Sequence, residues 1–304
     1  MKAQGALEYL IIIAAVLAIS AIVVLFLTGA FSGSGSRANV SKCNVAASNC
    51  GAQILGGSSA CAACGDSCKD SIGNDVIDGS VGCGLGCLLC KKGANIVSYG
   101  PMNLKGYWKF DETSGPTAAD SSINSNQGAW MNNPTPVPGR VGNALDFNGV
   151  NQYVQVSSSN SLNSPDAVTL SAWVFPRSII SGTGSPIIEK YQSYTLFIFS
   201  NKVSLYIHGS GSSQFYMGVT DIPLNAWSHI AASHDSSTNI VKFYLNSKLD
   251  RTVSTNLGKI VSNSNSLLIG GYFGGGYFNG MIEEARVFGK VLSDEEIKAL
   301  YDCC

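Results

Sequence analysis

The feature that most restricts the fold of this chain is a long series of short apolar runs separated by turn residues. These runs, of which Val168–Phe175 is one, follow one another through residues 101–304, with turn signals such as Asn148-Gly149 between them. A strand of this kind needs a second sheet to cover its apolar face, so the pattern predicts a mainly β, antiparallel sandwich or jelly roll. Within this domain only the end is predicted to be helical, because Ser293–Glu296 forms a capping box.

The cysteines set a second, smaller unit apart. Of the 10 cysteines, eight lie between Cys43 and Cys90, and none lies between Cys90 and Cys303. The segment 43–92 has few large apolar residues, so it needs covalent or metal staples. Disulfides fit an even count in an extracellular segment, zinc fits the two CxxC pairs, and one spacing matches an iron–sulfur motif. The disulfide candidates are Cys43, Cys50, Cys61, Cys64, Cys68, Cys83, Cys87, Cys90, Cys303 and Cys304.

The N-terminus carries an apolar run that is long enough to cross a membrane. From Leu10 to Leu27 every residue is apolar except Ser20. A helix over Ala6–Leu27 would be roughly 33 Å long, which spans a bilayer core. We therefore expect a hydrophobic helix over residues 4–31, followed by a linker over 32–42.

The residues ahead of this run have an unusual order for a signal peptide. A leader of only three residues, 1–3, precedes the polar segment Gln4-Gly5-Ala6-Leu7-Glu8-Tyr9-Leu10. This resembles the archaeal class III signal peptide of type IV pilin-like proteins, except that Ala6 stands where Ser is usual. The resemblance implies that a prepilin-type peptidase cuts between Ala3 and Gln4. It also implies that Glu8 pairs with the terminal amine of a neighbouring pilin subunit.

The resemblance also implies that the rest of the chain lies outside the cell, anchored to the membrane or built into a pilus-like filament. The tripeptide Asn39-Val40-Ser41 would suit glycosylation at Asn39. With a formal net charge of −1 and 13% charged residues, the chain offers no basic patch for nucleic acid.

The large domain resembles the laminin-G-like, concanavalin A-like jelly-roll family. The residues that carry this resemblance run in order from Trp108-Lys109-Phe110-Asp111-Glu112 through Asp120-Ser121-Ser122, Leu145–Gly149, Leu170–Val174, Trp227–Ala231, Phe243–Asn246 and Leu268–Gly271 to Phe278–Val287. Two positions depart from the family pattern: Glu283 replaces an Asp, and Ile123 replaces a turn Gly. The resemblance implies a lectin-like domain that binds glycans or a surface polymer.

Many domains of this family bind one calcium ion, and calcium prefers several oxygen ligands. The turn from Asp120 supplies Asp120, Asn124 and Asn126, and pairing of the first and last strands would bring Glu283 or Glu284 close. We expect calcium at this set and no organic cofactor. The alternative is a solvated turn with an ion pair to Arg286.

Candidate sugar contacts are aromatic side chains on a rim loop, which can stack on pyranose rings. The loop Gly271–Phe278 supplies Tyr272, Phe273, Tyr277 and Phe278, and Trp130 is a further candidate elsewhere in the chain. Trp108, Trp173 and Trp227 lie in strand patterns instead and are predicted to be core.

Catalysis finds little support in the sequence. A strand places adjacent residues on opposite faces, so Glu283 and Glu284 are not expected to act as a carboxylate pair. His208, His229 and His234 are interpreted as strand-end residues, and no GxSxG nucleophile is present. An anchored glycan hydrolase is therefore disfavoured. The function predicted is adhesion or glycan binding at the cell surface, and the alternative is a structural subunit whose jelly roll makes only protein–protein contacts.

Overall fold

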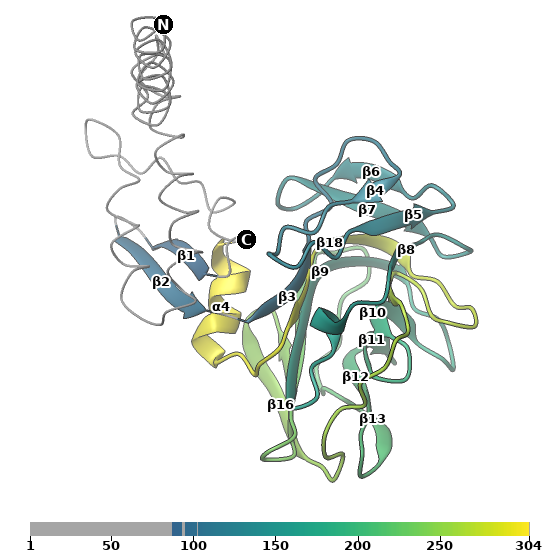
Figure 1. Ribbon diagram of the computed structural model, residues 1–304. Coiled ribbons are helices and arrows are strands. Elements are labelled where there is room, and N and C mark those ends of the chain that lie inside the picture. The colour runs from purple at the N-terminus through teal and green to yellow at the C-terminus, as the bar shows by residue number, and fades with distance from the viewer. Residues whose placement is uncertain (1–86, 93–94, 102, 304) are drawn as a thin grey trace, which may run out of the picture.

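The computed structural model describes residues 87–92, 95–101 and 103–303. Their main feature is a pair of antiparallel sheets, each of eight strands, that form a sandwich (Figure 1). Sheet A has the order β13 (Ser213–Met217), β12 (Lys202–His208), β11 (Tyr194–Phe199), β10 (Ser185–Lys190), β17 (Leu267–Ile269), β8 (Tyr153–Val156), β5 (Gly128–Met131) and β4 (Thr117–Ala118).

Sheet B lies against sheet A and contains β9 and β18, the longest strands in the described part of the chain. Its order is β16 (Lys248–Ser254), β15 (Ile240–Leu245), β14 (Ser228–Asp235), β9 (Ala167–Ser178), β18 (Asn279–Phe288), β7 (Asn143–Asn148) and β6 (Thr135–Pro138), and β3 (Leu104–Trp108) also pairs with β18. Outside the sandwich are the 3-10 turn η1 (Asn160–Leu162), the helix α4 (Asp294–Cys303) and a separate hairpin of β1 (Cys87–Lys92) and β2 (Asn95–Pro101). The antiparallel sandwich predicted from the sequence is confirmed.

Alternating side chains of the two sheets build one core between them. On β11, Tyr194, Leu196 and Ile198 point inward and are fully buried. Trp108 and Trp173 are also buried, as predicted, whereas Trp227 is half-buried and meets Phe175 edge-on. Every second side chain along a strand thus points inward, and burial of these apolar side chains stabilises the sandwich.

A second apolar cluster explains why β9 and β14 are buried on both faces. The helix α4 covers the outer face of sheet B with Ile297 and Leu300, which pack with Tyr107, Tyr244 and other buried residues of that face. The predicted capping box is present, since the Ser293 amide donates to Glu296 Oε2 (2.8 Å) and the Glu296 amide donates to Ser293 Oγ (3.2 Å). This cap fixes where the helix starts and so which side of it faces the sheet.

A β-bulge in β18 corrects the expectation that Glu283 and Glu284 face opposite sides of the sheet. Glu284 has a φ of +56°, and the pairing of β18 with β9 slips by one residue between Glu283 and Arg286. An extra residue in one strand breaks the alternation. Glu283 and Glu284 are consequently both buried, on the side of sheet B that also carries Arg286.

The leader, the apolar helix, Glu8, Asn39 and the bonding of the cysteine side chains lie outside the part that the structure describes. Within the described part, no helix has both the length and the apolar character needed to cross a membrane.

Candidate functional site

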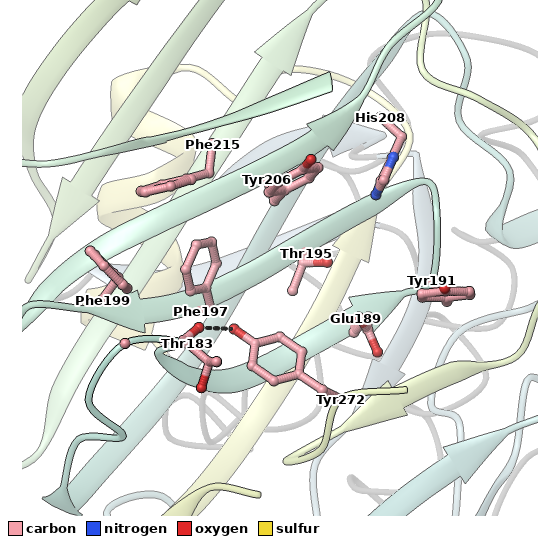
Figure 2. Close-up of a pocket in the computed structure, with 11 residues that line it drawn as sticks. Thr183, Glu189, Tyr191, Thr195, Phe197, Phe199, Tyr206, His208, Phe215 and Tyr272 are labelled. Atoms are coloured by element: carbon pink, nitrogen blue, oxygen red, sulfur yellow. Dashed lines mark hydrogen bonds between the residues drawn. The ribbon is translucent and has the colours of Figure 1, made fainter. Parts of the chain in front are cut away.

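A pocket of about 330 Å³ opens on the outer face of sheet A (Figure 2). It is formed by strands β10 to β13, by the loop before β10 and by the loop between β17 and β18. The lining residues are Gly182, Thr183, Glu189, Tyr191, Thr195, Phe197, Phe199, Tyr206, His208, Phe215 and Tyr272.

Strand register places the floor of the pocket in one line across four strands. Glu189 pairs with Thr195, Thr195 with Tyr206, and Tyr206 with Phe215. Residues that are directly opposite in an antiparallel ladder point to the same face. The four side chains therefore form a continuous row on the outer face, while their neighbours along each strand point into the core.

Aromatic rings stand around this row at steep angles to one another. Phe215 meets Phe197 at a centroid distance of 5.8 Å and Phe199 at 5.3 Å, and Phe197 meets Tyr272 at 6.4 Å, all edge to face. This is the arrangement that ring quadrupoles favour. Phe215 remains 41% exposed, so one aromatic face is available to a ligand.

The loop between β17 and β18 closes one side of the pocket. Gly274, Gly275 and Gly276 have φ values of +98°, +101° and +110°, a backbone region that suits glycine. The tight turn that they allow is closed by a hydrogen bond from the Tyr272 amide to the Gly276 carbonyl (2.9 Å). It directs Tyr272 into the pocket and stacks Phe273 on Tyr191 at the rim, with a centroid distance of 5.2 Å.

Glu189 is a buried carboxylate in this aromatic surrounding, and it lies beside Tyr272 (Figure 2). The Phe273 amide donates a hydrogen bond to Glu189 Oε2 at 2.5 Å. Burial nevertheless raises the pKa of Glu189 to about 7. Burial also lowers the pKa of His208, which keeps that imidazole neutral at pH 7. Among the lining residues that the structure describes, none is Lys or Arg.

The raised pKa of Glu189 predicts a loss of stability with rising pH. An unfolded Glu titrates near ~4.3, so between pH ~4 and ~7 the unfolded chain has released a proton that the folded chain keeps. The free energy of unfolding falls over this range. Glu189→Gln should therefore gain on the order of 1–3 kcal/mol over the wild type at pH 8 and nothing at pH 4. Urea denaturation at both pH values measures this, and an equal difference at both would contradict it.

The predicted sugar contacts divide into three groups. Tyr272 lines the pocket and Phe273 forms its rim. Tyr277 instead stacks on Tyr153 with a centroid distance of 5.9 Å, away from the pocket lining. Phe278 needs correction, because it is fully buried in the core, whereas Trp130 is 7% exposed on β5 and is one of the residues that line a different hollow of about 460 Å³.

Sequence reasoning missed most of the pocket, including Glu189, Phe197, Phe199 and Phe215. The sequence does not show which residues of β11 line the pocket, because this strand is apolar at nearly every position and both of its alternating faces look like core. The structure places His208 at the end of β12 and His229 and His234 one residue from the two ends of β14.

The residues proposed for calcium fall into separate hydrogen-bond networks. Asp120 accepts hydrogen bonds from the amides of Tyr107, Ser122 and Asn126, at 2.7–2.8 Å. The side-chain amides of Asn124 and Asn126 donate hydrogen bonds to the backbone carbonyls of residues 104–105. These contacts tie the turn from Asp120 to Asn126 to the first strand of the sandwich, β3.

The two glutamates of the proposed calcium set point into other contacts. Glu283 accepts hydrogen bonds from the amides of Arg140 (2.9 Å) and Val141 (3.1 Å), and Glu284 bonds Arg286 and the Tyr107 hydroxyl (2.5 Å). In the described part of the chain, no group of three or more His, Cys, Asp or Glu side chains is arranged to hold a metal ion. Calcium binding by the set of five stays a prediction.

The sandwich fold agrees with that of known proteins. Residues 148–298 match a laminin-G-type family model described as the concanavalin A-like lectin/glucanases superfamily. The jelly roll resembles concanavalin A-like domains over these residues. It is similar to domain 4 of AbnA, an extracellular arabinanase of family GH43 from Geobacillus stearothermophilus solved with arabinotriose. The TM-score is 0.53 and the identity 21%, over 66% of this chain and 98% of that one.

Two further proteins resemble the concanavalin A-like domain. The binding domain of Paraclostridial Mosquitocidal Protein 1 aligns with a TM-score of 0.54 and 15% identity, over 66% of this chain and 52% of that one. C-reactive protein of Mus musculus is 32% identical over 120 residues, which are 37% of this chain and 53% of the relative. This chain thus spans about half the length of the curated relative that it matches.

Proposed function

We propose that the protein is a cell-surface binding protein whose concanavalin A-like domain holds a glycan or surface polymer in the pocket on sheet A. The observation that carries this proposal is the row of Glu189, Thr195, Tyr206 and Phe215 with aromatic rings around it. Aromatic faces can cover the apolar side of a sugar ring, and a few polar groups among them fix its orientation. The pocket combines both on rigid strands.

Two of the similar structures support a binding role. Domain 4 of AbnA was solved with arabinotriose, and the mosquitocidal fragment is a binding domain. The chemistry of the pocket agrees, because Glu189 is the one carboxylate among the described lining residues. Glycoside hydrolysis generally requires two facing carboxyl groups. We therefore propose binding and not catalysis.

The remaining proposals concern the N-terminal part. A prepilin-type peptidase would cut between Ala3 and Gln4, and the apolar helix would hold the chain in the membrane or among other pilin subunits through Glu8. The cysteines would form disulfides, and Asn39 would carry a glycan. Intact mass spectrometry of the native protein tests the leader, the disulfides and the glycan together, because each changes the mass by a distinct amount.

A glycan array probed with the purified full-length chain tests the pocket. The expected result is binding to a restricted set of glycans that is lost when Phe215 is replaced. Failure to bind any glycan would contradict the proposal and favour the structural subunit that makes only protein–protein contacts.

Calcium binding at Asp120, Asn124, Asn126, Glu283 and Glu284 predicts a ligand-dependent melting temperature. A ligand that binds only the folded state stabilises it, so saturating calcium should raise the melting temperature and a chelator should reverse the rise. An unchanged melting temperature across a calcium titration would contradict this site.

A further inference from the structure

The charge of the pocket on sheet A has a consequence for the kind of glycan that fits it. Glu189 is 7% exposed, and no ion pair joins it to a cation among the described residues. Its Oε2 accepts a hydrogen bond from the Phe273 amide, which is the one partner of the carboxylate among the described residues, so Oε1 is left to face a ligand. A buried carboxylate without a positive partner is costly, and a ligand that brings the positive charge removes that cost.

The walls of the pocket favour the same charge. The rings of Phe197, Phe215 and Tyr272 stand edge to face around the floor, and their faces carry negative quadrupole potential. A protonated amine is attracted to such faces, and its hydrogen bond to a carboxylate is about twice as strong as one between neutral groups. An anionic sugar would instead be repelled by the Glu189 carboxylate and by the negative faces of the rings.

We propose that Glu189 is a specificity-determining residue that makes the pocket select amino sugars, which carry a free protonated amine, over N-acetylated and acidic sugars. This inference rests on the proposed glycan binding and assigns the chemical class of the glycan. The amine would lie against Oε1 of Glu189, and because Phe215 lies three strands away in the row, a neighbouring sugar ring of the same glycan would lie over Tyr206 and Phe215. The pKa of Glu189, about 7, means that the carboxyl changes its charge near neutral pH, and an ammonium partner would hold it ionised.

Calorimetric titration of the full-length chain at pH 7 tests this with three probes: a glucosamine trimer, its fully N-acetylated counterpart and a trimer of uronic acids. The glucosamine trimer is expected to bind roughly tenfold more tightly than the acetylated one, as one charge-assisted hydrogen bond predicts. The uronic acid trimer should bind most weakly. In Glu189→Gln the two hexosamine trimers should bind within about twofold of each other.

Glu189→Gln keeps an acceptor for the Phe273 amide, so the pocket should keep its shape. Glu295→Gln on α4 is the matched control, because it removes an exposed carboxylate outside the pocket and should leave the preference intact. Equal affinity of the wild type for the amine and acetylated trimers would overturn the inference, as would a preference that persists in Glu189→Gln. If other glycans on the array bind but none of the three trimers does, the inference is overturned and the proposed function stands. If no glycan on the array binds, the proposed function is overturned as well.

Discussion

Replacing Arg286 by methionine is expected to lower the free energy of unfolding of the jelly roll by roughly 3–5 kcal/mol. Arg286 is 1% exposed and forms an ion pair with Glu284, which is 2% exposed. Its guanidinium also bonds the Tyr107 hydroxyl at 3.0 Å and lies 4.2 Å from the centroid of that ring. Methionine would fill most of the space but would leave the Glu284 carboxylate buried without its charge partner.

The measurement is chemical denaturation of the full-length chain and its variants. Arg177→Met is the matched control, because Arg177 pairs with Asp146 at 2.6 Å but is 37% exposed, and exposed pairs contribute at most about 1 kcal/mol. Adding Glu284→Gln to Arg286→Met should restore a large part of the loss, since the uncompensated charge is then gone. A loss below about 1 kcal/mol for Arg286→Met would show that the network contributes little.

Replacing Phe215 by alanine is expected to weaken glycan binding about tenfold or more while the stability of the fold changes little. Phe215 is 41% exposed on the edge strand β13, so the core keeps its packing without this ring. A ligand that covers the ring would lose about 1–2 kcal/mol of apolar burial in the variant, which corresponds to roughly tenfold in affinity.

Titration of any glycan found on the array measures this effect, with thermal unfolding as the test of folding. Leu249→Ala is the control, since Leu249 is 46% exposed on β16 of the other sheet. Unchanged affinity in Phe215→Ala would place the glycan elsewhere on the domain. A similar loss in Leu249→Ala would show that the effect is not specific to the pocket.

The candidate site could be predicted only in part. The glycine-rich loop marked Tyr272 and Phe273, because aromatic residues among glycines are visible along the chain. The floor of the pocket could not be predicted in this way. Its residues are spread over four strands and are far in sequence from the loop that they contact. The hydrogen bond from the Phe273 amide to Glu189, for example, spans 84 positions.

Local sequence determined the elements of this protein. The spacing of apolar and turn residues predicts the strands and the sandwich, and the capping box Ser293–Glu296 predicts the start of α4. Tertiary structure decided which face of each strand carries function. On β11 both faces are apolar, and only the covering sheet determines that Leu196 is core while Phe197 lines a pocket.

The bulge at Glu284 is a second feature that tertiary structure, and not local sequence, decided. Two adjacent glutamates on a regular strand would face opposite sides, and nothing local to Glu283 and Glu284 indicates otherwise. They share one side because Tyr107 and the amides of Arg140 and Val141, which come from distant segments, hold the irregular backbone together with Arg286 of the same strand. Strand periodicity is a local property of the chain, whereas the partners that stabilise a break in it are supplied by the packing of the whole domain.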